Sequence, residues 1–209
     1  MKANLHFGTT IGLTLCLGMV ALMLSSCGGD AALPKPRAFY RINYPERNYV
    51  TYDVGCPYTF ERPDYSEVVS DIEGDEKYCW INLDYKPFDA DLHISYKPIV
   101  QEGDFQHLIN DAYAFVDEHN RMADGITEER ISNSSMDAHG LLFKIEGNTA
   151  SNLQFFLTDS TKHFFRASLY FNCEPNKDSL APVVKFVSED IDYLISSFRW
   201  TDVELEVFR

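Results

Sequence analysis

Apolar and polar residues alternate with a period of two in three consecutive segments between residues 140 and 171. Every second residue is apolar in each segment: Leu141, Phe143 and Ile145; then Leu153, Phe155 and Leu157; then Phe165, Ala167, Leu169 and Phe171. Such alternation is typical of strands with a buried face. Gly147 and Asn148 separate the first two segments, and Asp159 and Ser160 the last two, as turn-forming residues do. The pattern predicts a three-stranded antiparallel meander. Its second face is also fairly apolar, so we expect helices or another layer to cover it.

The residues before this meander predict a hairpin and a helix. Alternation over residues 79–85 and 90–98 indicates two paired strands. From Asp104 the apolar residues recur every three or four positions, which predicts an amphipathic helix of about five turns that Gly125 ends. Its apolar stripe contains Phe105, Leu108, Ile109, Ala112, Phe115, Val116 and Met122. A strand over residues 126–135 is expected to lead back to the meander.

A second amphipathic helix is predicted from Leu180 to Phe198, with Asp178 or Ser179 as its N-cap. Its buried stripe contains Val184, Val187, Ile191, Leu194, Ile195 and Phe198. With a further strand over residues 49–54, the order predicts an α+β fold, in which helices pack on an antiparallel β-sheet. This order resembles the sandwich of the PsbP and Mog1 family, where a late hairpin precedes a closing helix.

The first residues have the pattern of a lipoprotein leader. Lys2 supplies a positive charge, residues 7–24 are largely apolar, and the string LSSC, ending at Cys27, matches a lipobox. We therefore predict a signal peptide over residues 1–26 and lipidation of Cys27. The alternatives are an uncleaved transmembrane anchor and an ordinary secretory signal. Several acyl chains on Cys27 would anchor the protein firmly in a membrane.

Beyond this leader the composition indicates one folded, acidic domain. We expect a lipidated tether over residues 27–36 and a single globular domain over residues 37–209. Aromatic residues make up 14% of the chain, which argues against disorder. The formal net charge of −14 disfavours binding to phosphate backbones, so we expect no nucleic-acid partner.

Four cysteines remain after the leader: Cys27, Cys56, Cys79 and Cys173. Export favours oxidation, and Cys56 and Cys79 form the pair that we expect to be a disulfide. A Cys79–Cys173 bridge is the competing arrangement. No CxxC spacing is present, which disfavours both a metal centre and a redox site.

Long ordered strings in this chain resemble the gliding-motility lipoprotein D (GldD) family of Bacteroidetes. They are EGNTASNLQFFLTDSTKHFFRASLYFN, PNKDSLAPVVKFVSEDIDYLISSF, PKPRAFYRINYPERNY, CPYTFERPDY and CWINLDYKPFDADLHISYK. The resemblance implies a cell-envelope lipoprotein of the gliding and type IX secretion apparatus, without a known catalytic site. No acidic cluster directly follows Cys27, which favours a periplasm-facing protein. We expect it to be anchored in the outer membrane.

The candidate chemistry is sparse. Residues 158–163 contain a nucleophile, an acid and a base, but a catalytic triad needs groups that converge from separate elements, and Asp159 and Ser160 are good turn formers. The histidines have no HExxH or i, i+4 spacing, so no metal or cofactor is predicted.

Three functions are consistent with these features. The first is a non-enzymatic accessory protein that contacts other gliding and type IX secretion proteins of the envelope. For it, the polar loop residues Asn152, Asn176 and Lys177 are candidate contacts, while turn and cap chemistry is the competing explanation. The second is a membrane-tethered module that binds a small ligand in a cleft between sheet and helix. The third is a hydrolase that uses Ser160 or His163.

Overall fold

The computed structural model describes residues 41–70, 79–133 and 136–203. All the elements below belong to one compact unit, which begins at Ile42. Among the described residues, no helix is both long and apolar enough to span a bilayer. The predicted signal peptide, tether and Cys27 lie outside the described residues.

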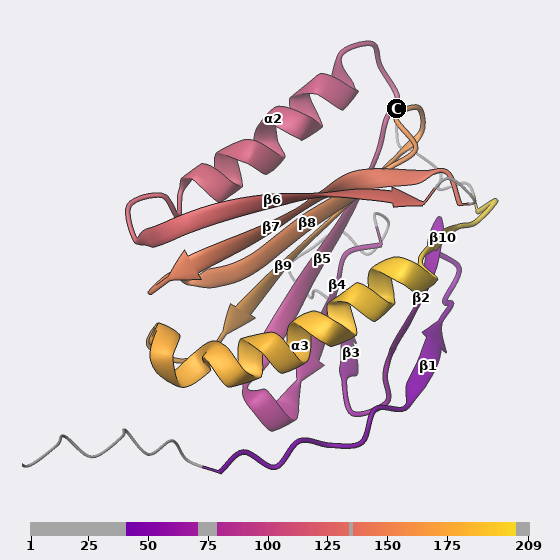
Figure 1. The fold of residues 1–209 in the computed structure, drawn as a ribbon. Coiled ribbons are helices and arrows are strands. Elements are labelled where there is room, and N and C mark those ends of the chain that lie inside the picture. The colour runs from indigo at the N-terminus through magenta and orange to yellow at the C-terminus, as the bar shows by residue number, and fades with distance from the viewer. Residues whose placement is uncertain (1–40, 71–78, 134–135, 204–209) are drawn as a thin grey trace, which may run out of the picture. The chain divides into compact units, whose positions relative to one another are not determined.

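The unit is built on two antiparallel sheets (Figure 1). The larger has seven strands in the order β3-β4-β5-β9-β8-β7-β6. Its strands are β3 (Glu67–Ser70), β4 (Ile81–Tyr85), β5 (Ala90–Pro98), β6 (Ala123–Asn133), β7 (Ala138–Gly147), β8 (Ser151–Thr158) and β9 (His163–Phe171). The smaller sheet has the order β1-β2-β10, formed by β1 (Tyr49–Tyr52), β2 (Tyr58–Pro63) and β10 (Arg199–Trp200).

Two helices lie on opposite faces of the larger sheet, α2 (Asp104–Asp117) on one and α3 (Lys177–Ser197) on the other (Figure 1). A short 3-10 helix, η2 (Lys86–Phe88), connects β4 and β5. The predicted α+β class, the hairpin and the meander β7-β8-β9 are confirmed. The closing helix is confirmed as well, although it begins earlier than the pattern predicted.

Both faces of the meander are buried, each in its own core. On the α3 side, alternate residues of β8 and β9 pack against the helix and the small sheet. This core includes Phe155 of β8, Phe165 of β9, Val187, Ile191 and Leu194 of α3, and Tyr58 and Phe60 of β2. On the α2 side a smaller core contains Leu108, Ala112, Val116, Phe143, Ile145, Phe156 and Phe164. Two covered faces explain why these strands contain almost no continuous polar side.

The end predicted for the first helix is wrong. The helix α2 stops at Asp117, and hydrogen bonds of the i→i+3 type continue the chain through a turn to Met122. Gly125 lies in β6, where the register with β7 shifts between Ala123 and Gly125. The glycine therefore marks a bulge rather than a helix terminus. Met122, which was assigned to the apolar stripe, is 54% exposed.

Candidate functional site

The turn between β7 and β8 meets the start of α3 at one end of the larger sheet. Oδ1 of Asn148 accepts a hydrogen bond from the backbone N–H of Lys177 at 2.9 Å. The ammonium of Lys177 pairs with Asp124, at the start of β6. We call Asp124, residues 147–152 and residues 174–178 together the turn–helix surface. Two polar loops that are distant in sequence thus form one continuous surface.

Two of the three candidate contact residues also shape the backbone. Nδ2 of Asn152 donates to the carbonyl of Ile145 at 3.3 Å, which ties the turn to β7. Asn176 is the N-cap of α3, and its Oδ1 accepts from the backbone N–H of Ser179 at 3.2 Å. The expectation that Asp178 or Ser179 caps this helix is therefore wrong, because the helix begins at Lys177. The third candidate, Lys177, is exposed, with 51% of its side chain accessible to solvent.

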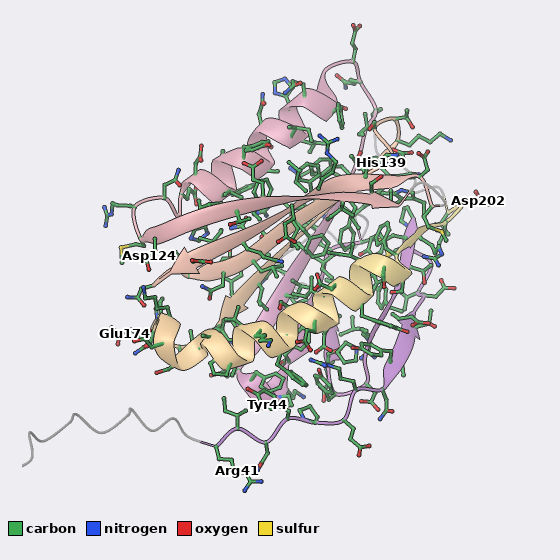
Figure 2. All side chains as sticks on the ribbon, viewed as in Figure 1. Arg41, Tyr44, Asp124, His139, Glu174 and Asp202 are labelled. Carbon is green, nitrogen blue, oxygen red and sulfur yellow. A yellow bond between two sulfur atoms is a disulfide. The ribbon has the colours of Figure 1, made fainter. Side chains whose placement is uncertain are left out.

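The turn–helix surface lies at the opposite end of the molecule from the tip of the small sheet. Figure 2 shows Asp124 and Glu174 at the first end, and His139 and Asp202 at the other. Glu174 and Asp202 are both exposed acidic residues. They offer matched positions for probing the two ends separately.

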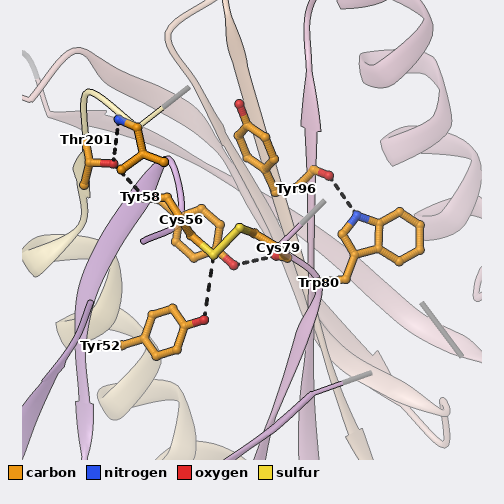
Figure 3. Close-up of a disulfide and its surroundings, with 8 residues drawn as sticks. Tyr52, Cys56, Tyr58, Cys79, Trp80, Tyr96 and Thr201 are labelled. Atoms are coloured by element: carbon orange, nitrogen blue, oxygen red, sulfur yellow. Dashed lines mark hydrogen bonds between the residues drawn. A yellow bond between two sulfur atoms is a disulfide. The ribbon is translucent and has the colours of Figure 1, made fainter. Parts of the chain in front are cut away.

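A disulfide joins Cys56 to Cys79, as predicted, and both residues are buried (Figure 3). Their Cα atoms are 5.8 Å apart, within the usual range. The hydroxyl of Tyr58 donates to the carbonyl of Cys79 at 2.6 Å, and that of Thr201 donates to the carbonyl of Cys56 at 2.7 Å. Cys173 is exposed with a free thiol, so the competing Cys79–Cys173 bridge is not formed.

The turn between β8 and β9 is organised by Asp159. One carboxylate oxygen, Oδ1, accepts from the backbone N–H groups of Thr161, Lys162 and His163 at 3.0, 2.8 and 2.9 Å. Burial alone would raise the pKa of Asp159, but these hydrogen bonds outweigh it, and the pKa is lowered. Ser160 adopts a left-handed backbone with φ of 65°. The carboxylate of Asp159 is thus hydrogen-bonded to the backbone of its own turn.

His163 is held on the other side of that turn by aromatic neighbours. Its Nδ1 is 2.7 Å from the hydroxyl of Tyr96, and its ring stacks on Trp200 with centroids 4.9 Å apart. Burial lowers the pKa of His163, so the neutral imidazole is favoured. No group of three or more histidine, cysteine or acidic side chains in the described ranges is placed to hold a metal ion.

A buried carboxylate that the sequence patterns did not reveal connects the first described residues to α3. Asp190 has a fully buried side chain and accepts from Nε of Arg47 at 3.1 Å and from the hydroxyl of Tyr49 at 2.9 Å. Tyr65 also donates to it. Burial raises the pKa of Asp190, although these three partners oppose that shift. One signal was available, since Asp190 falls on the helix stripe between Val187 and Ile191.

Fold and disulfide together define an α+β protein with a buried disulfide, a bond that oxidising compartments favour. The chain belongs to the family described as gliding motility lipoprotein GldD, whose sequence model matches residues 29–200. It is therefore a lipid-anchored envelope protein of a family that serves gliding motility.

Among solved structures, the chain is similar to cyanobacterial PsbP (CyanoP) from Synechocystis sp. PCC 6803. The identity is 15% and the TM-score 0.47, and the match covers 75% of this chain and 95% of that one. No curated protein matches the chain.

Proposed function

We propose that this protein is a non-enzymatic accessory component of the gliding motility and type IX secretion machinery, and that it acts through protein–protein contacts. The observation that carries the proposal is the family match over residues 29–200. The resemblance links that family to both processes. The partners are other envelope proteins of the same machinery.

The anchor in this proposal is a lipidated Cys27, which holds the domain at the periplasmic face of the outer membrane. The lipobox LSSC supports it. A clickable fatty acid should label the wild-type protein and leave Cys27→Ala unlabelled. Equal labelling of the two proteins would place the lipid elsewhere. Fractionation of inner and outer membranes, followed by protease treatment of intact cells, tests the assigned membrane and its face.

The turn–helix surface is the contact region in this proposal. Its loops are tied together by the bond from Lys177 to Asn148 and by the bond from Asn152 to Ile145. A surface that is ordered before binding loses less conformational entropy when a partner docks. These features support recognition in addition to turn and cap chemistry.

Photo-crosslinking in living cells tests this assignment directly. A benzoylphenylalanine at position Glu174 should give crosslinks to a defined envelope protein, whereas the same group at Asp202 should give none or different ones. Both positions are exposed and acidic, and they lie at opposite ends of the molecule (Figure 2). Crosslinks at Asp202 alone would move the contact region to the other end.

A charge swap separates recognition from internal stability. Asp124 and Lys177 form an ion pair whose side chains are 57% and 51% exposed, so solvent screens the pair and it contributes little to folding. Lys177→Glu should impair gliding or secretion at normal protein abundance. Asp124→Lys combined with Lys177→Glu restores the pair but reverses the charges that a partner meets. Full recovery in the double variant would show that the pair is only structural.

The hydrolase alternative requires Ser160 or His163, in or next to the turn between β8 and β9, for function, whereas our proposal requires neither. Ser160→Ala and His163→Ala should each leave gliding and secretion intact wherever the folded protein accumulates normally. Loss of function at full abundance in either variant would revive an enzymatic role.

A further inference from the structure

The face of the larger sheet that carries α2 is only partly covered. The helix packs over β7, β8 and β9 through Leu108, Ala112 and Val116. Beside it, between α2 and strands β4, β5 and β9, a cleft of about 250 Å³ remains. This volume is slightly below the range of about 300–1,000 Å³ typical of drug-sized ligands, so the cleft suits a smaller molecule.

Aromatic rings form the walls of this cleft. Trp80 and Phe164 line it from the sheet, and Phe115 lines it from α2. The indole N–H of Trp80 donates to the carbonyl of Tyr96 at 2.8 Å, which fixes the ring (Figure 3). Phe115 is 44% exposed despite its place in the apolar stripe of the helix. Flat apolar walls of this kind fit a ring or a branched aliphatic group.

The polar part of the cleft is centred on Arg166, which is half-buried on β9. Its Cζ lies 4.1 Å from the ring centroid of Phe115, and its Nη2 donates to Oε1 of Gln154 at 2.8 Å. A guanidinium has five N–H donors, and Gln154 is the only hydrogen-bond acceptor that it finds among the described residues. Burial lowers the pKa of Arg166, which indicates a cation that lacks full compensation.

Two further donors beside Arg166 have no partner in the described part of the chain. They are Nε2 of Gln154 and the hydroxyl of Ser168, on residues that are 2% and 1% exposed. The two residues face each other across β8 and β9. A second hollow, lined by Ser168, Arg166, His93 and Tyr170, adjoins the cleft and shares Arg166 and His93 with it. The amide N–H groups of Gln154 lack an acceptor and the hydroxyl of Ser168 can donate or accept, so acceptor atoms of a ligand would match both residues.

The local charge sets the charge of that ligand. Lys97 and Arg166 line the cleft, and Asp111 is the acidic residue in its lining. Glu118 lies close enough to interact with Arg166 as well. Two cations and two acids therefore meet at this cleft, and the acidic neighbours disfavour a dianion such as phosphate.

We infer that the cleft binds a monoanionic carboxylate carried on a flat or branched apolar group. The carboxylate pairs with the Arg166 fork, and the apolar group lies between Trp80 and Phe115. Guanidinium and carboxylate match in geometry and form charge-assisted hydrogen bonds. A small organic acid and the C-terminal carboxylate of a polypeptide share this chemistry. The inference goes beyond the proposed function, since it holds whether or not the turn–helix surface contacts a partner.

Fluorine NMR on the full-length protein in detergent tests the site. The chain has two tryptophans, so 5-fluorotryptophan gives two signals, one from the cleft and one from Trp200. N-acetylphenylalanine should shift the Trp80 signal in a saturable way and leave the Trp200 signal in place. N-acetylphenylalanine amide has the same shape without the charge and should bind at least about tenfold more weakly. Equal binding of acid and amide, or no saturable shift, would overturn the inference.

Matched variants test the role of the guanidinium. Arg166→Gln should weaken binding of N-acetylphenylalanine by about tenfold or more, and Lys97→Gln by a smaller factor, since Lys97 is exposed. Arg130→Gln removes an exposed arginine from β6, outside the cleft, and should change nothing. If Arg166→Gln does not fold, the Lys97→Gln variant and the comparison of N-acetylphenylalanine with its amide still test whether the cleft binds a carboxylate. Undiminished binding by a folded Arg166→Gln variant would refute the site.

A binding experiment with peptides distinguishes the two sources of the carboxylate, a small organic acid and a polypeptide C-terminus. A pentapeptide that ends in phenylalanine is compared with its C-terminally amidated form. Tighter binding of the free-acid peptide than of N-acetylphenylalanine assigns the site to a polypeptide terminus, and weaker binding assigns it to a small acid. Either result upholds the carboxylate site, whereas equal binding of free and amidated peptides contradicts it.

Discussion

Removing the disulfide should lower the free energy of unfolding by an amount that follows from the length of the loop that the bond closes. Cys56 lies two residues before β2 of the small sheet, and Cys79 lies two residues before β4 of the larger sheet. The bond therefore fastens one sheet to the other. Both cysteines are buried, 5% and 7% exposed, so the link belongs to the core rather than to a surface loop. The informative perturbation is the double substitution Cys56→Ser and Cys79→Ser.

The magnitude follows from the length of chain that the bond closes. The two cysteines are 23 residues apart, and the chain-entropy model gives a stabilisation of about 3 kcal/mol for such a loop. For a domain of this size, 1 kcal/mol corresponds to a change of roughly 2–4 °C in melting temperature. We therefore expect the double variant to melt about 6–12 °C below the wild type. Reduction of the wild-type protein should produce a similar loss.

Urea denaturation of the full-length protein in detergent, followed by tryptophan fluorescence, measures this loss. Cys173→Ser is the control, because Cys173 is exposed and free and its replacement should leave the midpoint unchanged. It also prevents thiol exchange with the other cysteines. A double variant whose free energy of unfolding lies within about 0.5 kcal/mol of the control would refute the reasoning, since surface substitutions alone change stability by that much.

Three further predictions concern single positions. Asn176→Ala removes the N-cap of α3 and should cost about 1 kcal/mol in chemical denaturation, whereas Asn176→Asp should keep most of it. Gly140→Ala places a Cβ against the backbone carbonyl of Phe156 and should cost about 1–3 kcal/mol, while Gly125→Ala, with open space around it, should cost far less. Asp159→Ala should cost about 1 kcal/mol at pH 7. Because the folded-state pKa of Asp159 is lowered, its stabilisation is present above the unfolded pKa and disappears as the pH falls through the folded pKa. The difference in stability between the variant and the wild type should therefore shrink as the solution is acidified through that range.

Patterns within short segments of the sequence were sufficient to predict the meander β7-β8-β9. The meander has strict alternation and clear turns, and its strands β7, β8 and β9 pair as consecutive neighbours. The small sheet was harder to foresee. Its strand β2 pairs with β1 and also with the two-residue β10, which follows the last helix. Pairing between such distant segments leaves no local signature, and a strand of two residues cannot show alternation.

Among the functional features, the turn and cap residues could be predicted from the sequence, whereas the cleft could not. Turn and cap residues such as Asp159 and Asn176 were identifiable by type, although the cap was assigned two or three positions too late. The cleft around Arg166 could not be predicted, because it depends on how far α2 extends across the sheet. The alternation did place Arg166 and Ser168 on the second face of the meander. That face was expected to be covered, and the cleft lies where α2 leaves part of it open.

The network at Asp190 fastens the first described residues of the domain to α3. In a lipid-anchored protein, force on the domain is transmitted through the segment that enters it. Here that segment packs on α3, where Tyr44 stacks on Phe186 with centroids 4.4 Å apart and Arg47 pairs with Asp190. Peeling the segment away would strip the fully buried carboxylate of Arg47 and Tyr49, and loss of a partner from a buried pair costs about 3–5 kcal/mol. The exposed side of Arg47 reduces this cost, because the guanidinium can rehydrate. The buried carboxylate is thus best explained as the attachment of the entry segment, which leaves the opposite, α2-bearing face of the sheet free to bind a ligand.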